Sequence, residues 1–219
     1  MKKYLEILKK CPLFVGIEED NLLRMLTCLR AEIKEAAKKE IISAEGSAVN
    51  SIGILLSGSA HIIQYDYYGN KSLFANINAS EVFNEAFACA GVDSLPISVV
   101  ANEPCTVMFI DCSHILHTCS NGCGFHHTLI YNLMKDLAVK TIMFHQKIEV
   151  TSKRTTRDKL LAYLGIEAKK AKSNSFKIPF DRQELADYLE VDRSGLSAEI
   201  SKMRKEGVLG SEKNQFKLF

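Results

Sequence analysis

The chain has 219 residues, a formal net charge of +2 at pH 7 and 47% hydrophobic residues. This length allows a hydrophobic core in each of two domains, and the composition is that of a soluble protein. No apolar run is long enough for a signal peptide or a membrane span, so we expect a cytoplasmic protein without membrane contact. The seven cysteines lack the spacing of a small disulfide scaffold, and in a reducing compartment they are expected to be thiols or ligands.

The small net charge hides an uneven distribution. Residues 151–219 carry 15 Lys and Arg against 10 Asp and Glu, a net of +5, whereas residues 1–150 have a net of −3. A phosphate polyanion would therefore attract the C-terminal part of the chain and repel the rest.

The first 110 residues change from helical to β patterning. Residues 3–35 are expected to form a small helical element, to which no chemistry is assigned. From residue 40 onward, short β runs alternate with turn residues, which is typical of a sandwich or barrel rather than of β-α-β units. The expected strands are Glu40–Ser43, Ser51–Leu56, His61–Tyr65, Leu73–Ile77, Ile97–Ala101 and Val107–Ile110.

Cysteine and histidine are dense between residues 112 and 127. Cys119 and Cys123 are four residues apart and would share a helix face if the helix starts that early, with His126 or His127 as a third ligand. Three interpretations stay open: a zinc or iron–sulfur site, a thiol redox switch, or cysteines that pack as small hydrophobic residues. The spacing matches no known metal signature, so we assign no metal and no other cofactor.

The sequence does not predict an enzyme. No Ser/His/Asp set, glycine-rich phosphate loop or pair of carboxylates stands out. Because a catalytic site needs a nucleophile with an oriented base, or groups that play equivalent roles, we expect a protein without catalytic activity.

A long helix is predicted after Gly124, because no proline or further glycine follows until beyond residue 150. It would extend ~40 Å, and its apolar residues repeat at alternating steps of four and three, as in a two-stranded coiled coil. These seam residues are Ile130, Met134, Leu137, Thr141, Phe144 and Ile148. A second stripe, expected to face the barrel, consists of Phe125, Leu129 and Leu133, with Val139 and Met143 nearby. The alternative is a core helix within one chain.

A polar linker over residues 151–156 precedes a predicted helix from Arg157 to about Lys170. Its cations Lys153, Arg154 and Arg157 are either phosphate contacts or part of a solvated hinge. Residues 176–178 are expected to form a short strand.

Two short helices are predicted next. The first starts at Asp181, whose carboxylate can cap the free amides while Glu184 reaches back to complete a capping box. The second follows the N-cap Asp192 and ends before Gly207. Its buried face consists of Leu196, Ile200 and Met203. Helices with so short a connector fit a helix-turn-helix, and the alternative is a pair of amphipathic helices in an ordinary bundle.

The second of these helices would enter the major groove of DNA. Arg193, in its first turn, can donate two hydrogen bonds to a guanine edge, and the serines beside it can reach a base or a phosphate. After Leu209, a turn at Lys213 followed by a strand would make a wing. The DNA-binding residues expected from this arrangement are Arg182, Gln183, Arg193, Ser194, Ser197 and Lys202.

The run RQELADYL, followed by DRS, LS, EI, M and EG within residues 182–207, resembles the winged helix-turn-helix of the CRP/FNR superfamily of bacterial transcription regulators (cyclic-AMP receptor protein and fumarate–nitrate regulator). The resemblance implies an α+β fold with a jelly-roll sensor domain, a double-stranded β-helix, over residues 1–120. A dimerisation helix over 121–150 and a winged helix-turn-helix over 151–219 would follow. It also implies a homodimer on a pseudo-palindromic operator of double-stranded DNA, with RNA polymerase as a further partner.

Family members that bind cyclic AMP hold its phosphate on an arginine and its ribose on a glutamate. The residues that match this effector pocket are Val82, Phe83, Asn84, Glu85, Ile142 and Met143. Glu85 matches the ribose glutamate, but Leu95 and Pro96 stand where the family has Arg and Ser or Thr. A buried phosphate would lack both a counter-charge and an amide donor, so we expect an effector other than cyclic AMP. The competing hypothesis is a ligand- or metal-binding barrel that acts through protein contacts.

Overall fold

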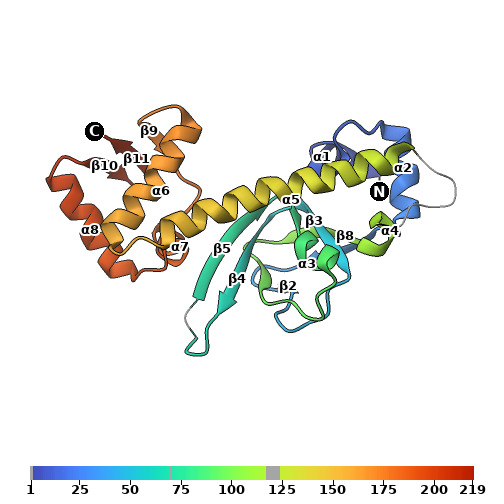
Figure 1. The fold of residues 1–219 in the computed structure, drawn as a ribbon, viewed down its shortest axis with the longest axis horizontal. Coiled ribbons are helices and arrows are strands. Elements are labelled where there is room, and N and C mark those ends of the chain that lie inside the picture. Colours follow the sequence, from blue (N-terminus) through green and yellow to red (C-terminus); the bar gives the residue numbers. More distant parts are fainter. Residues whose placement is uncertain (1, 70, 117–123) are drawn as a thin grey trace. The chain divides into compact units, whose positions relative to one another are not determined.

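The computed structural model describes residues 2–69, 71–116 and 124–219. Internal contacts divide the chain into two units (Figure 1). The first unit comprises Met1–Gln64 and Phe74–Lys140, and the second comprises Tyr65–Leu73 and Thr141–Phe219. The long helix α5 (Gly124–Thr151) contributes residues to both units.

The first unit begins with short helices and then turns to strands earlier than predicted. The helices are η1 (Lys2–Tyr4), α1 (Leu5–Leu8), η2 (Pro12–Phe14) and α2 (Glu19–Cys28). The expectation of helix up to residue 35 is wrong, because Glu32–Ala36 form strand β1. Four of the five β1 residues are exposed, so hydrogen bonds to the antiparallel neighbour β8 (Cys105–Asp111), and not a buried apolar face, hold β1 extended.

Two four-stranded sheets form the body of the first unit, with strand orders β1-β8-β3-β6 and β2-β7-β4-β5. The remaining strands are β2 (Ile41–Ser43), β3 (Ser51–Ser57), β4 (Ser59–Tyr65), β5 (Lys71–Asn78), β6 (Val82–Phe83) and β7 (Ser98–Ala101), and the short helices are α3 (Glu85–Ala90) and α4 (Cys112–Leu116). Six strands were predicted within a few residues of their ends, and the sequence missed β1 and β6. The predicted α+β class is confirmed: an antiparallel barrel-like domain, a long helix and a helix-turn-helix.

Close packing between β3 and β6 explains one glycine of the barrel. Gly53 on β3 lies opposite Phe83, and a Cβ at position 53 would come within 2.1 Å of the Phe83 ring. Only a residue without a side chain fits beneath the ring, so Gly53 lets the buried Phe83 close this end of the core.

The first half of α5 is fixed to the N-terminal helices. Leu129 and Leu133 are buried in the same core cluster as α1 and α2. The Asn132 side chain donates hydrogen bonds to the carbonyl oxygens of Leu13 at 3.0 Å and Val15 at 2.8 Å. The predicted barrel-facing stripe is therefore correct in this half.

The stripe prediction is wrong further along α5. Val139 and Met143 are 49% and 52% exposed, so the apolar residues of α5 do not all turn inward. None of the helices within the described ranges combines the length and the hydropathy that a membrane span requires.

The second unit is a helical domain with a small antiparallel sheet. Its elements are α6 (Thr156–Ala171), β9 (Ser175–Lys177), α7 (Arg182–Leu189), α8 (Arg193–Lys205), β10 (Leu209–Glu212) and β11 (Gln215–Leu218). The strand order is β10-β11-β9, and the β10–β11 hairpin is the predicted wing. Tyr163, Phe180 and Tyr188 pack together, with ring centres 4.9 to 6.0 Å apart, between α6 and α7.

Candidate functional site

The two predicted helices, α7 and α8, form a helix-turn-helix with the predicted caps. Asp181 Oδ1 accepts a hydrogen bond from the Glu184 amide, and Glu184 Oε2 accepts one from the Asp181 amide, both at 2.8 Å. Glu190, in the left-handed conformation with φ 54°, ends α7, and α8 begins at Arg193. The predicted inner face of α8 is buried, namely Leu196, Ile200 and Met203.

The first turn of α8 presents Arg193 to solvent, whereas Ser194 serves the cap. The Ser194 hydroxyl donates to the Asp192 carboxylate, which also accepts the Gly195 amide at 2.8 Å. These two bonds lower the pKa of Asp192, so the cap stays ionised. Ser197 is half-buried one turn further on. Arg193 is therefore the long, exposed donor of this turn, and Ser194 could reach DNA only by giving up its cap bond.

An open hollow of about 680 Å³ lies between α8 and the wing, and Arg182 lines it. Arg182 Nη2 donates to the carbonyl oxygen of Lys213 at 3.5 Å, and the guanidinium lies 5.7 Å from the centre of the Phe216 ring. Burial, and then the charge of Arg193, lowers the pKa of Arg182. Its Nη1 is buried and has no hydrogen-bond partner within the described part of the chain. A half-buried cation with an unused donor suits an anion such as a backbone phosphate.

The remaining predicted DNA contacts differ in how free they are. Lys202 is exposed on α8. Gln183 donates to Asp187 Oδ1 at 2.7 Å, and Asp187 in turn pairs with Lys71 at the start of β5 at 3.5 Å. Gln183 is thus held within a local polar chain, whereas Lys202 can reach outward.

Three cations that the sequence did not select also line the hollow: Arg204, Lys213 and Lys217. The predicted wing contained the signal for two of them, because a hairpin beside a recognition helix brings its cations to the same surface. The structure adds them to the candidate interface.

Arg157 was predicted as either a phosphate contact or part of a solvated hinge, and the structure favours a third role. Its Nη2 lies 2.7 Å from Glu206 Oε2, and its Nη1 lies 3.4 Å from Glu199 Oε1. The pKa of Arg157 is raised and that of Glu206 is lowered by this pairing. Arg157 therefore ties α6 to α8 through these two ion pairs.

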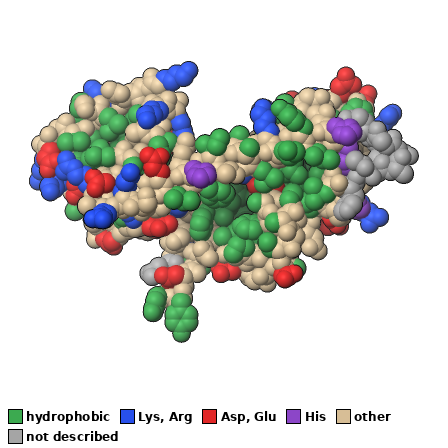
Figure 2. Space-filling model, viewed as in Figure 1, with side chains coloured by type: hydrophobic (Ala, Val, Ile, Leu, Met, Phe, Trp, Pro, Cys, Tyr) green, Lys and Arg blue, Asp and Glu red, His purple; other side chains and the backbone are tan. Residues whose placement is uncertain are grey.

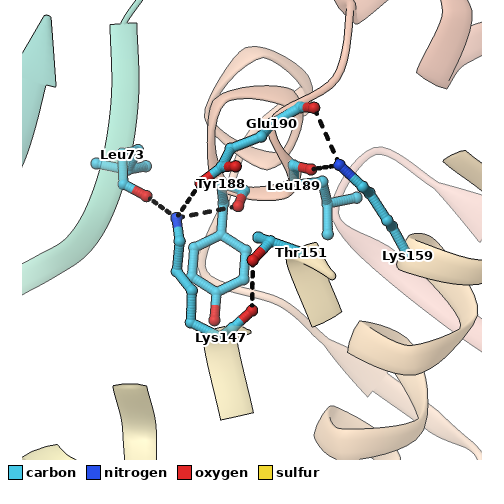
Figure 3. A network of polar contacts seen from close by, with 7 residues as sticks. All are labelled: Leu73, Lys147, Thr151, Lys159, Tyr188, Leu189 and Glu190. Carbon is cyan, nitrogen blue, oxygen red and sulfur yellow. Dashed lines mark hydrogen bonds and ion pairs between the residues drawn. The ribbon is translucent and has the colours of Figure 1, made fainter. Parts of the chain in front are cut away.

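Lys147 of α5 is buried where three segments of the second unit meet (Figure 3). Its Nζ donates to the carbonyl oxygen of Leu73 in β5 and to that of Tyr188 at 3.1 Å, and it lies 3.9 Å from the Glu190 carboxylate. Lys159 of α6 donates to the carbonyl oxygens that follow Tyr188 in α7. The carbonyls at the end of a helix carry partial negative charge, so both ammonium groups stabilise the end of α7. Burial lowers the pKa of Lys147 to about 8.

Four of the six predicted effector residues lie next to one another at the junction of β6 and α3. Val82 and Phe83 are buried in β6, and Asn84 is held at φ 64° with its side chain on Ser43 Oγ at 2.9 Å. Glu85 begins α3 and is also buried. Ile142 and Met143 belong to the second unit, where both are exposed.

A lysine that the sequence did not select forms ion pairs at this junction of β6 and α3, which we call the effector cassette (residues 82–85). Lys140 Nζ lies 2.8 Å from Glu85 Oε1 and 2.9 Å from Asp136 Oδ2, and it donates to the Val82 carbonyl oxygen at 2.7 Å. Glu85 and Asp136 are both buried, so one ammonium group serves two carboxylates in a poorly solvated place. No sequence pattern links positions 85 and 140, which lie on different elements.

The positions that would hold a cyclic phosphate carry no charge. Leu95 is buried, and its backbone amide and carbonyl oxygen bond to Ser47 and Gly46, at 2.9 and 2.8 Å. Pro96 beside it has no amide hydrogen to donate. These two backbone hydrogen bonds anchor the loop that contains Leu95 to the turn at Gly46 and Ser47.

Most of the predicted seam is exposed along α5. Met134 and Ile148 are 64% and 62% exposed, Thr141 and Phe144 are exposed too, and Ile130 and Leu137 are half-buried. Hydrophobic side chains gather along the course of this helix in Figure 2. A row of exposed apolar residues at heptad spacing is expected to be covered by a partner.

The predicted metal candidates Cys119 and Cys123 lie outside the described residues, and His127 is exposed. The neighbouring His126 has Nε2 3.0 Å from the His114 carbonyl oxygen, a local structural bond. Within residues 2–69, 71–116 and 124–219, no group of three or more His, Cys, Asp or Glu side chains is arranged to hold a metal ion.

Two family models match the sequence. The cyclic nucleotide-binding domain matches residues 33–121, and the Crp-like helix-turn-helix domain matches residues 158–218. No curated protein matches the sequence.

Solved structures share the fold along most of the chain. The c-di-GMP-responsive global regulator CLP of Xanthomonas campestris has a TM-score of 0.72 at 13% identity, with 92% of this chain and 99% of that chain covered. FixK2 of Bradyrhizobium japonicum has a TM-score of 0.63 at 17% identity, covering 86% and 92%. CprK, solved in complex with OCPA, has a TM-score of 0.69 at 12% identity, covering 90% and 88%.

Proposed function

The chain belongs to the CRP/FNR superfamily and is a DNA-binding transcription regulator of that type, and we propose that it reads a pseudo-palindromic operator as a homodimer. The observation that carries the proposal is the exposed first turn of α8, where Arg193 projects from a doubly capped helix-turn-helix. Two such helices would enter successive major grooves about 34 Å apart.

Within this proposal, DNA contacts divide into base reading and phosphate binding. Arg193 reads a base, because a guanidinium can donate two hydrogen bonds to a guanine edge. Arg182, Ser197 and Lys202, together with the cations of the hollow, hold the DNA backbone, whereas Gln183 and Ser194 would first have to release Asp187 and Asp192. The buried Nη1 of the half-buried Arg182 supports this division, since a phosphate would supply the acceptor that this atom lacks among the described residues.

The homodimer would form through the seam of α5. Exposed Met134, Phe144 and Ile148 at heptad spacing support this assignment, because a second copy would bury the same row of side chains. As a regulator of this type, the dimer would meet its operator and RNA polymerase in the cytoplasm.

The effector is a molecule other than cyclic AMP. The barrel has the buried Leu95 and the exposed Pro96 where a phosphate-binding arginine and amide would be needed. Glu85 Oε1 is already paired with Lys140, and only the buried Oε2 of this carboxylate lacks a hydrogen-bond partner among the described residues. Ile142 and Met143 offer a ligand apolar surface only.

The test compares two arginine variants on several duplexes. A preferred duplex is first selected from a random pool by the wild-type protein. Arg193→Ala should then lower the preference for that duplex over others by about 5- to 150-fold, since one bidentate base contact is lost. Arg182→Ala should weaken binding to all duplexes by a similar factor. Thermal melting of both variants checks the fold.

An equal loss on every sequence for Arg193→Ala would show that Arg193 contacts phosphate and not a base. If Arg182→Ala, and not Arg193→Ala, abolished the preference for the selected duplex, then Arg182 would read the base and Arg193 would bind phosphate.

A further inference from the structure

Two cysteines far apart in the sequence meet in the first unit. Cys89 lies on α3 and Cys112 begins α4, and their sulfur atoms are 3.3 Å apart. A disulfide bond is ~2.05 Å long, so an approach of roughly 1 Å would join them. No motif indicated this pair, because 23 residues separate the two positions.

The pair is open to small reagents from one side. A hollow of about 400 Å³ is lined by both cysteines and by Asn50, Ala88, Asp111 and Ser113. Cys89 is half-buried and borders this hollow, whereas Cys112 is only 3% exposed. A reagent in the hollow would therefore reach the more exposed Cys89, whose sulfur lies 3.3 Å from that of Cys112.

We propose that Cys89 and Cys112 are a redox-active dithiol that a hydroperoxide converts to a disulfide. Cys89 is the attacking thiolate. The hydrogen bond from Cys112 lowers the pKa of Cys89, and the neighbouring sulfur together with burial raises the pKa of Cys112, so the proton stays on Cys112.

The reaction balances in two steps. The Cys89 thiolate attacks one oxygen of the hydroperoxide, the O–O bond breaks, and Cys89 sulfenic acid and an alkoxide or hydroxide result. The Cys112 sulfur then attacks the Cys89 sulfur, the S–O bond breaks, and water leaves with the Cys112 proton. The two sulfurs lose two electrons in total, and the peroxide oxygens gain them. A dithiol reductant reverses the change by thiol–disulfide exchange.

The other described cysteines lack this arrangement. Cys11 is fully buried, and burial raises its pKa to about 12. The Cys105 thiol is buried and lies 3.2 Å from the Ser59 carbonyl oxygen and 3.0 Å from that of Glu103. Cys28 is exposed on α2, so it offers a control for simple accessibility.

The disulfide would act on the effector cassette through α3. Glu85, which holds Lys140 of α5, begins the same helix that carries Cys89 about one turn later. Drawing Cys89 toward Cys112 moves this short helix and with it the carboxylate bound to α5. This consequence for DNA binding rests on the proposed function, whereas disulfide formation itself does not.

The first test is chemical. Protein reduced and purified without oxygen is treated with hydrogen peroxide and mapped by mass spectrometry without reduction. We expect one linked peptide pair containing Cys89 and Cys112, two hydrogens lighter, which dithiothreitol separates. Cys28→Ser should form the same link. Cys112→Ser should leave Cys89 as a sulfenic acid, which dimedone traps. If serine at this buried position destabilises the core, Cys112→Ala replaces it and should give the same product.

A link from Cys89 to Cys119 or Cys123, or free Cys89 and Cys112 after treatment, would overturn the proposal. DNA affinity is measured on the same samples. Oxidation should change it about 5- to 150-fold, as is typical of coupled sites, in wild type and Cys28→Ser but not in Cys112→Ala. Failure of every sample to bind DNA would refute the proposed function and leave the peptide map to decide on the dithiol.

Discussion

Lys147 illustrates how one buried charge can set a pH dependence of stability. Its folded pKa is lowered to about 8 from 10.5, so the unfolded chain binds more protons between these values. The cost of burying the ammonium is fully present below pH 8, and the free energy of unfolding therefore rises from pH 8 toward 10.5. The slope is at most about 1.4 kcal/mol per pH unit.

Lys147→Met should remove this rise. Urea unfolding of wild type and variant between pH 7 and 10 measures it, and the difference between the two proteins isolates Lys147. Measurements stop at pH 10 because Tyr188, whose pKa burial raises to about 12, complicates the balance above that value. Lys159→Met keeps Lys147 in place and should keep the rise. A rise that persists in Lys147→Met would mean that another group causes it.

Residue-level prediction from sequence succeeded where partners are close along the chain. The capping box of Asp181 and Glu184 spans three residues, so spacing alone specified it. Lys147 and Leu73 are 74 residues apart, and the contact becomes visible only when the fold brings α5 and β5 together. Lys140 with Glu85 escaped prediction for the same reason.

At the scale of elements, α5 offers the sharpest test of the homodimer. Replacing both Phe144 and Ile148 with glutamate puts charge at two exposed seam positions, so like charges would face each other across a two-fold interface. We expect light scattering to show a monomer. DNA affinity should fall about 10²- to 10⁴-fold, because the two helix-turn-helix domains would no longer be linked in one dimer.

Lys135→Glu is the matched control for the seam, since Lys135 is exposed on the same helix outside the heptad positions. It should remain dimeric. A double variant that stays dimeric and binds DNA as wild type does would place the interface elsewhere.

Elements with their own pattern were predicted well. The uninterrupted apolar repeat after Gly124 specified α5 nearly to its end at Thr151. Strand β1 has no buried face, and strand β6 has only two residues, so neither leaves a periodic signal. Their extended form depends on pairing with strands distant in the sequence.

At the scale of the whole molecule, cyclic AMP should be without effect. Isothermal titration with cyclic AMP at millimolar concentration is expected to give no saturable heat, because Leu95 and Pro96 supply neither counter-charge nor amide at the phosphate position. The affinity for the selected duplex, measured with and without the nucleotide, should be the same. Saturable binding that shifts DNA affinity would instead show that the barrel finds its phosphate ligands elsewhere.

The order of the domains could be predicted because three patterns follow one another along the sequence: short β runs, a long heptad repeat and a pair of capped helices. The chemistry of the barrel could not be predicted as far. Glu85 matched a ligand-binding position by motif, yet its partner turned out to be a lysine of this same chain.

The cluster of Glu85, Asp136 and Lys140 also limits which amino-acid substitutions related proteins can tolerate at these three positions. A buried carboxylate that loses its ammonium is destabilising by about 3–5 kcal/mol, so single substitutions at these positions would be purged unless a neighbour changes as well. Orthologues should therefore show the three positions covarying, with an apolar trio as the alternative state.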